Sequence, residues 1–331
     1  CSYKANVWNL NDRSISQFWN DKELEELRQS FLANKKHSLC HLCWKEEESG
    51  HSSLRQRLNT FRESENVTKA IEKYITNKDY KKFPKVLSVV PGNQCNLACN
   101  ICEPGTSSKL NSEIKNYPSN FILKQKENWN MTDEEYADIV DHSEHIQKIE
   151  LYGGEPFYNK KNKTQLIDKI VQKGTSKNIT LYFNTNCTVY DHEFMQILSK
   201  QFKKIEIRAS IDGINKQYEY LRYGGKYKDV IENCKKFFNL DNADFEIIST
   251  ISLWNFLYLD DYYEEFCNKY KYSVRWNLVS DTDYLLLHQL PENAKKSVNL
   301  SDRFKFVESH IKHTPSDPIA WKKFTIFTKI L

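Results

Sequence analysis

The chain has 331 residues, of which 39% are hydrophobic, 13% aromatic and 28% charged, and this apolar content excludes a wholly disordered chain. The 48 basic and 44 acidic residues nearly cancel to a formal charge of +4, so a strong nucleic-acid or membrane-surface field is not indicated. No apolar run reaches the roughly 20 residues of a membrane span, and nothing is typical of a signal peptide.

Residues 1–84 are predicted to form a small, mainly helical module. Asn20, followed by Glu23, predicts a helix start, because a side-chain oxygen can cap the exposed N–H groups of a first turn. Further along, Cys40 and Cys43 have the CxxC spacing that can ligate zinc or an iron–sulfur cluster. The sequence therefore predicts a cysteine module ahead of the main fold.

The ligand set of this module has two alternatives. Cys1 joins Cys40 and Cys43 as a third sulfur ligand. Because residue 1 is Cys rather than Met, we expect the chain to begin inside a longer reading frame, with the fourth ligand before it. The alternative is a zinc ion whose tetrahedron is completed by a histidine. The histidines available for it are His37, His41 and His51.

Residues 85–281 alternate between short β-branched runs and amphipathic helical segments. The six predicted strands are 86–90, 149–152, 179–183, 205–209, 245–251 and 274–279. The predicted helices between them are 132–145, 163–173, 191–200, 227–238 and 258–270. Such alternation predicts an α/β fold with parallel strands, because a parallel return needs a long crossover connection. Six units are fewer than the eight of a closed barrel, so a partial (β/α)6 TIM-like barrel or a doubly wound sheet fits, followed by a helical tail over 282–331.

Three cysteines follow the first predicted strand in a CxxxCxxC spacing. They are Cys95, Cys99 and Cys102, and one loop can fold their thiolates around a single metal centre. Iron–sulfur cubes normally take four Cys thiolates. Three thiolates would leave one iron with an open position, which is typical of a catalytic metal centre.

A second motif ends the next predicted strand. Gly153 and Gly154 allow unusual dihedral angles and close approach of the backbone to a ligand. Glu155 offers an acceptor for an amino group, and Pro156 stops the strand and fixes the turn.

Together these two motifs resemble those of the radical S-adenosylmethionine (SAM) superfamily. The resemblance implies that Cys95, Cys99 and Cys102 hold a [4Fe–4S] cluster at the end of the first barrel strand. It implies that the vacant iron binds SAM and that reductive cleavage yields a 5′-deoxyadenosyl radical, which abstracts hydrogen from a substrate. An electron donor such as a flavodoxin or ferredoxin is implied as well. The GGEP-like turn, Gly153–Pro156, would bind the SAM amino group.

The resemblance extends to polar residues at later strand ends. These are Asn184, Thr185, Asn186, Ser210, Asp212 and Arg222. The first three resemble the family's TNG segment near the SAM ribose, with Cys187 in place of Gly. Ser210 and Asp212 resemble its S-x-D-G segment. Ser210 and Arg222 are then expected at the SAM carboxylate.

The N-terminal cysteine module resembles the twitch module, a half-size relative of the SPASM extension of peptide-modifying radical SAM enzymes. It implies a second [4Fe–4S] cluster and a peptide or protein substrate. The alternatives are an RNA or small-molecule substrate, or a non-catalytic zinc or iron–sulfur scaffold on a degenerate barrel. The near-neutral charge disfavours RNA. Nine cysteines without a signal peptide indicate a reducing, cytoplasmic location.

Asp281 and Asp283 follow the sixth predicted strand. We hypothesise from this position that one of them acts as a base after hydrogen abstraction.

Overall fold

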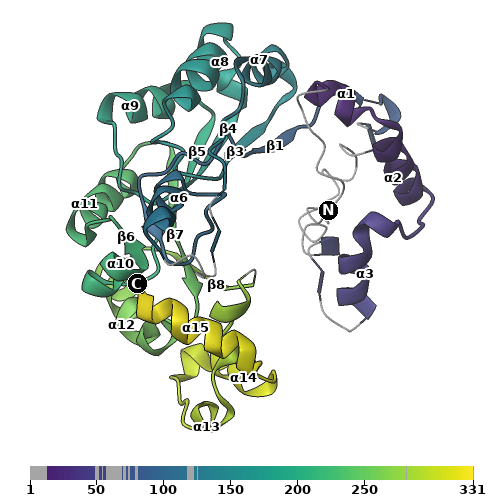
Figure 1. Cartoon of the computed structure of the whole chain (residues 1–331). Helices are drawn as coiled ribbons and strands as arrows, with labels where there is room; N and C mark the ends of the chain where they lie inside the picture. The colour runs from purple at the N-terminus through teal and green to yellow at the C-terminus, as the bar shows by residue number, and fades with distance from the viewer. Residues whose placement is uncertain are drawn as a thin grey trace. The chain divides into compact units, whose positions relative to one another are not determined.

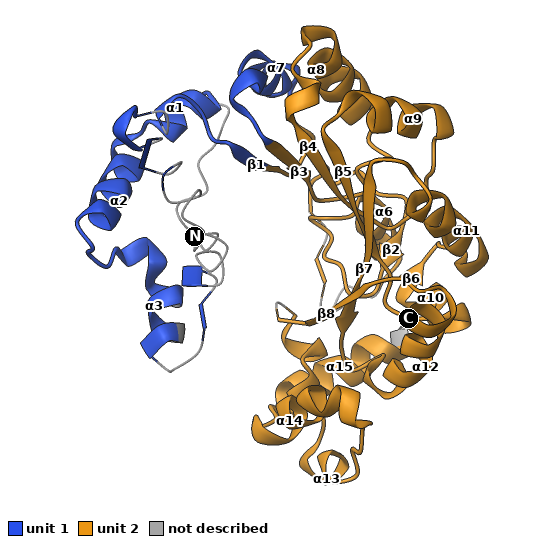
Figure 2. Cartoon of the chain, turned by 180° about the vertical axis from the view of Figure 1, so that it is seen from behind, with its two compact units in different colours: residues 1–87, 132–147 blue, residues 88–131, 148–331 orange. Residues whose placement is uncertain are grey.

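The computed structural model has an α/β fold built around one six-stranded sheet (Figure 1). The residues it describes are 13–48, 52–53, 55–56, 69, 72–73, 75–78, 81–117, 123–124, 126–280 and 282–330. The chain divides into two compact units, coloured blue and orange in Figure 2: residues 1–87 with 132–147, and residues 88–131 with 148–331. In the described part, no helix is both long and apolar enough to cross a bilayer. The module boundaries at residues 84 and 281 stay predictions.

The first unit is mainly helical in its described residues and also contains the start of strand β1 (Val86–Val89). Its helices are α1 (Ile15–Trp19), α2 (Lys22–Leu32), α3 (His41–Glu48) and α7 (Asp133–Asp141). The predicted cap of α2 was wrong by one residue. Asp21, not Asn20, is the N-cap, and its side chain accepts a hydrogen bond from Glu23 N. Asn20 instead ends α1, where its amide donates to the carbonyl of Ser16.

The sheet contains the six predicted strands in the order β1-β3-β4-β5-β7-β8. Their bounds are β1 (Val86–Val89), β3 (Lys148–Leu151), β4 (Thr180–Thr185), β5 (Lys204–Ser210), β7 (Ala243–Ile251) and β8 (Val274–Leu278). The pairs from β3 to β8 are parallel. The predicted partial barrel is thereby confirmed rather than a doubly wound sheet, because the strands follow one another in chain order across the sheet without the reversal of a doubly wound fold.

One face of the sheet is apolar and covered by helices. Leu181 and Phe183 of β4 point to this face and are buried. The covering helices include α8 (Asp168–Lys173), α9 (His192–Gln201) and α11 (Tyr227–Phe238), which lie along one side of the strands in Figure 1. Helix α11 has the predicted bounds. The predicted helices at 163–173 and 258–270 contain π-helical turns at Asn162–Ile167 and Glu264–Lys269, the second following α12 (Leu259–Tyr263).

The opposite face of the sheet carries a ladder of charged side chains. Arg208 of β5 is at its centre and is 7% exposed. Its guanidinium lies 3.1 Å from Asp244 and 3.2 Å from Glu246. Glu246 also pairs with Arg275 at 2.6 Å, on the rim of the ladder. Arg208 is the buried member of the ladder, whereas Asp244 is half exposed and Asp244 and Glu246 have second partners in Lys204 and Arg275.

We expect Arg208→Met to lower the free energy of unfolding by about 1–3 kcal/mol, the cost of losing several charge-assisted contacts to partly exposed carboxylates. The matched control is Arg275→Met, because Arg275 contacts the same Glu246 but its side chain is half exposed. The control should cost under about 1 kcal/mol. Urea unfolding of both variants tests this, and equal costs would contradict the central role of Arg208.

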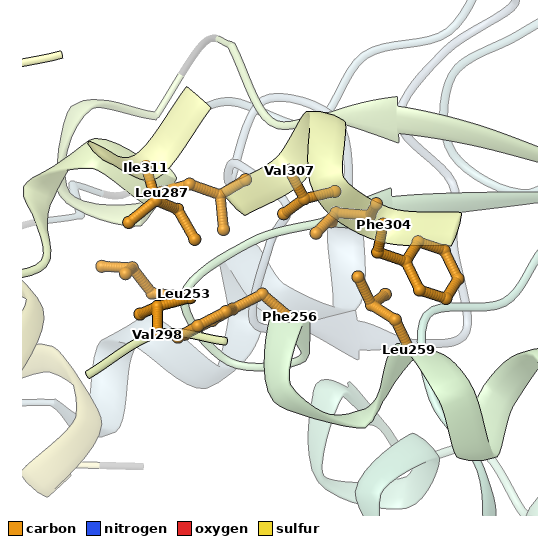
Figure 3. Close-up of a cluster of buried hydrophobic side chains, with 9 residues drawn as sticks. Leu253, Phe256, Leu259, Leu287, Val298, Phe304, Val307 and Ile311 are labelled. Carbon is orange, nitrogen blue, oxygen red and sulfur yellow. The ribbon is translucent and has the colours of Figure 1, made fainter. Parts of the chain in front are cut away.

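The C-terminal tail packs onto the segment that follows β7. Its helices are α13 (Glu292–Lys295), α14 (Lys305–His313) and α15 (Pro318–Ile330). Figure 3 shows the apolar cluster that joins tail and barrel, made by Leu253, Phe256, Leu259, Leu287, Val298, Phe304, Val307, Ile311 and Ile251. In a second cluster, Phe327 of α15 is buried with Tyr284, and Ile101 of the cysteine loop packs against them. The tail therefore supports the loop that carries the three cysteines.

Candidate functional site

The cysteine loop is held by the start of the short helix α6 (Ser108–Glu113). Ser108 Oγ accepts a hydrogen bond from Cys95 N at 3.1 Å and donates to Cys95 O at 3.2 Å. Ser107 Oγ donates to Leu97 O at 2.6 Å. Cys95 and Cys99 are buried, and Cys102 is half-buried. These serines were missed by sequence reasoning, because a hydroxyl next to a helix start is also an ordinary cap.

A two-stranded antiparallel ribbon brings a distant segment onto this loop. Strand β2 (Ala98–Cys99) pairs with β6 (Arg222–Tyr223), which follows α10 (Asn215–Leu221), and the register places Cys99 opposite Arg222. Asn100 extends the contact, since its backbone N donates to Leu221 O at 2.9 Å. The ribbon therefore positions Arg222 beside a cysteine more than a hundred residues earlier in the chain.

The Gly153–Pro156 turn packs directly against the cysteine loop. Gly153 and Gly154 have φ angles of 70° and 43°, in the left-handed region that favours glycine. Glu155 N donates to Gln94 O at 2.8 Å. A Cβ on Gly154 would overlap the carbonyl group of Gln94. The second glycine is therefore required by a close approach between two backbones.

Glu155 is 1% exposed and accepts three hydrogen bonds. Thr185 Oγ1 and Asn186 N each donate to its carboxyl group at 2.7 Å, and Phe157 N donates at 3.2 Å. Burial raises the pKa of Glu155 to about 7, although these hydrogen bonds act in the opposite direction. The side chain can therefore change its protonation state near neutral pH.

The segment at the end of β4 joins this carboxyl group to the cysteines. Asn186 Nδ2 donates to Cys95 Sγ at 3.9 Å. Asn184 Oδ1 accepts a hydrogen bond from Ser210 Oγ at 3.1 Å, which links two predicted site residues. Cys187 has a φ of 58°, so it occupies the left-handed conformation that a glycine would adopt without strain.

Arg222 and Asp212 form a buried ion pair on the other side of the loop. Asp212 Oδ2 accepts from Arg222 Nε at 2.8 Å and lies 2.6 Å from Nη2. The third nitrogen, Nη1, donates to Cys99 Sγ at 3.9 Å. The structure thus brings together residues of all the predicted motifs: the cysteines, the GGEP-like turn, the β4 end, the S-x-D-G segment and Arg222.

The three cysteine thiols differ in the way they could bind a cluster or a single ion. Within the described ranges, no three His, Cys, Asp or Glu side chains are placed to hold one metal ion. Zinc needs four ligands that converge on one point, whereas cysteines at three corners of a cube each bind a different iron. Burial raises the pKa of the Cys95 thiol to about 11, so a cluster must displace its proton at neutral pH. The hydrogen bond from Cys102 and burial raise the pKa of the Cys99 thiol, and the charge of Arg222, whose N–H group is directed at this sulfur, acts in the opposite direction.

The N-terminal cysteines lie in the first unit. Cys40 is buried and Cys43 is half-buried, at the start of α3. Burial raises the pKa of the Cys40 thiol. His37 Nδ1 accepts a backbone hydrogen bond at 3.3 Å, which occupies one of its ring nitrogens. Cys1 and His51 lie outside the described residues, so the ligand set of this module stays a prediction.

The hypothesis of a base at Asp281 or Asp283 stays a prediction. Asp283 pairs with Lys323 of α15 at 2.5 Å, at the foot of the C-terminal tail. Asp281 lies outside the described residues.

A comparison with family models matches residues 89–267, more than half of the chain, to the model described as the Radical SAM superfamily. The match spans the cysteine loop, the turn at Gly153–Pro156 and Arg222. No curated protein matches the chain.

Solved structures of similar fold include native anSMEcpe with bound AdoMet, which is 20% identical, with a TM-score of 0.46 over 61% of this chain and 53% of that one. Streptococcus suis SuiB bound to precursor peptide SuiA is 18% identical, with a TM-score of 0.42 over 81% and 60%. TYW1 with a lysine-pyruvate adduct is 11% identical, with a TM-score of 0.39 over 62% and 69%. The chain therefore spans about half the length of the first of these proteins.

Proposed function

The chain belongs to the radical SAM superfamily, and we propose that it binds a [4Fe–4S] cluster and SAM in its second unit and abstracts hydrogen from a peptide substrate. The observation that carries this proposal is one continuous set of contacts within that unit. Glu155 contacts Asn186, which contacts Cys95. Cys95 lies in one buried cluster with Cys99, and Cys99 contacts Arg222.

Each motif has its own task in this proposal. Cys95, Cys99 and Cys102 hold the cluster, which when bound supplies the electron that cleaves SAM to methionine and a 5′-deoxyadenosyl radical. The turn made by Gly153, Gly154, Glu155 and Pro156 binds the amino group of SAM. Ser210 and Arg222 bind its carboxylate, and Asp212 orients Arg222. Asn184, Thr185 and Asn186 border the ribose.

Glu155 makes this proposal testable through pH. A carboxylate accepts hydrogen bonds from the SAM amino group more strongly than a carboxylic acid does. Ionising Glu155 in the free protein costs up to about 3 kcal/mol, because its pKa lies near 7 rather than at the ordinary 4.5. Folding carries none of this cost below pH 4.5, where Glu155 is neutral in both the folded and the unfolded state. The stability of the folded protein falls as the pH rises through 7.

We therefore expect SAM affinity to rise up to about tenfold per pH unit below pH 7 and to level off above it. Titration calorimetry on cluster-loaded protein between pH 5.5 and 8.5 measures the curve. Glu155→Gln is the control, because it keeps the shape of the side chain and removes its titration. Any slope that remains in this variant belongs to SAM itself. Identical curves for the two proteins would contradict the assignment of Glu155.

A peptide substrate and a second cluster are the finer parts of the proposal. The CxxC at Cys40 and Cys43 provides two sulfur ligands for a second [4Fe–4S] cluster. Iron analysis separates the possibilities: about eight irons per chain support two clusters, and about four with one zinc support the zinc alternative. We propose a peptide because a net charge of +4 over 331 residues provides no basic stripe for RNA.

The substrate class is tested by which added pool stimulates 5′-deoxyadenosine formation. Deuterated cellular peptides should stimulate it and transfer deuterium to the product. Stimulation by RNA or by small metabolites alone would contradict the peptide proposal. A flavodoxin or ferredoxin in place of dithionite tests the proposed electron donor in the same assay.

A further inference from the structure

A buried positive charge lies directly beside one of the three cysteines proposed to hold the cluster. Arg222 is 7% exposed, and its Nη1 points at Cys99 Sγ from 3.9 Å. Its Nε and Nη2 both contact Asp212, which is 1% exposed. The guanidinium therefore bridges a carboxylate on one side and a cluster ligand on the other.

The bridge is fixed from both ends. Asp212 Oδ1 accepts from Thr250 N at 2.8 Å, and Asp212 O accepts from Asn255 Nδ2 at 2.8 Å, so the end of β7 holds the aspartate. At the other end, the β2–β6 register places Cys99 opposite Arg222. The backbone pairing of β2 with β6 and the side-chain pairing of Arg222 with Asp212 both hold the guanidinium beside Cys99. It can turn away from the sulfur only if one of these two pairings breaks.

Reduction of a [4Fe–4S] cluster adds one electron and therefore one negative charge. A fixed cation next to a ligand sulfur stabilises the reduced form, and a hydrogen bond to that sulfur acts in the same direction. Burial strengthens the effect, because little water screens the charges. Asp212 opposes it through its own negative charge, but it lies on the side of Arg222 that faces away from the sulfur contact.

We propose that Arg222, positioned by Asp212, sets the reduction potential of the cluster bound at Cys99. This inference rests on the proposed function, since it requires the cluster, and it assigns the ion pair a task that precedes SAM binding. Arg222 acts directly on the ligand sulfur, and Asp212 is a positioning residue. The competing explanation is that the pair only ties the β2–β6 ribbon to the end of β7.

The two explanations differ in the sign of their effects. Arg222→Gln removes the cation and leaves Asp212, so we expect the equilibrium constant for one-electron reduction to fall at least about tenfold, equivalent to 59 mV. Asp212→Asn removes the opposing charge and keeps an amide oxygen that can accept from Arg222, while the β2–β6 register still holds Arg222 opposite Cys99, so the potential should shift in the opposite direction. Arg222→Lys keeps the charge but loses the planar fork, and its potential should lie between those of Arg222→Gln and the wild type. The double variant should lie between the two single variants.

The experiment is a redox titration of the cluster-loaded full chain in the absence of SAM, with dithionite as reductant and the reduced cluster followed by electron paramagnetic resonance. Iron content is measured first for every variant. A wild-type chain that binds no cluster would overturn the proposed function at that step. Clusters with unchanged potentials in Arg222→Gln and Asp212→Asn, or with shifts of the same sign in both, would overturn the inference alone. If Arg222→Gln loses its cluster, Arg222→Lys against Asp212→Asn supplies the same comparison.

Discussion

Replacement of Cys99 by Ala should abolish SAM cleavage. The proposed cluster has three cysteine ligands. Of these, Cys99 is buried and faces Arg222. Loss of outer partners of a metal ligand typically costs about 10- to 100-fold, so loss of a ligand itself should exceed about 100-fold in 5′-deoxyadenosine formation. Bound iron should fall with it, because two thiolates hold a cube poorly.

The matched control for this prediction is Cys267→Ala. Cys267 is half-buried in the π-helical turn Glu264–Lys269, outside the site. The Cys267→Ala variant loses one thiol and leaves the cysteine loop unchanged, so its iron content and product formation should stay at wild-type levels. Retention of iron and activity in Cys99→Ala would show that the CxxxCxxC thiols do not hold the catalytic cluster.

Gly154→Ala should have the second-largest effect, through a backbone collision. Gly154 has a φ of 43°, and a Cβ there would overlap the carbonyl group of Gln94 in the cysteine loop. Backbone atoms cannot yield as a flexible side chain can. The turn and the loop must therefore separate, which displaces Glu155 from Thr185 and Asn186. We expect SAM affinity to fall at least about tenfold.

Gly174→Ala separates this collision from the cost of an unfavourable φ. Gly174 ends α8 with a φ of 79°, and nothing lies within 4 Å of an added Cβ. This variant should lose about 1 kcal/mol of stability and bind SAM normally. Calorimetric SAM titrations of both variants make the comparison. Normal SAM binding by Gly154→Ala would contradict the proposed place of this turn in the site.

The strand positions could be predicted from the sequence because the central strands β3, β4, β5 and β7 each bury an apolar face. Alternation of apolar residues is a local signal, and it placed the six strands of the main sheet within a few residues. The cap of α2 could not be assigned with the same accuracy, since Asn20 and Asp21 are adjacent and both are good cap residues. Only the end of α1 at Trp19 decides between them.

The motif residues of the site could be found from the sequence, but their partners could not. Ser107, Ser108 and Asn100 carry no signal of their own, and their contacts depend on long-range pairing. The ion pair of Asp212 with Arg222 depends on the β2–β6 ribbon, whose strands have two residues each and no detectable periodicity. The left-handed conformation of Cys187 likewise follows from its neighbours rather than from its residue type.

The most direct test is anaerobic loading of the full chain with iron and sulfide, followed by SAM and dithionite. The proposal predicts a coloured protein with at least about four irons per chain that converts SAM to 5′-deoxyadenosine and methionine. A chain that stays colourless, or that binds iron without forming 5′-deoxyadenosine, would contradict it.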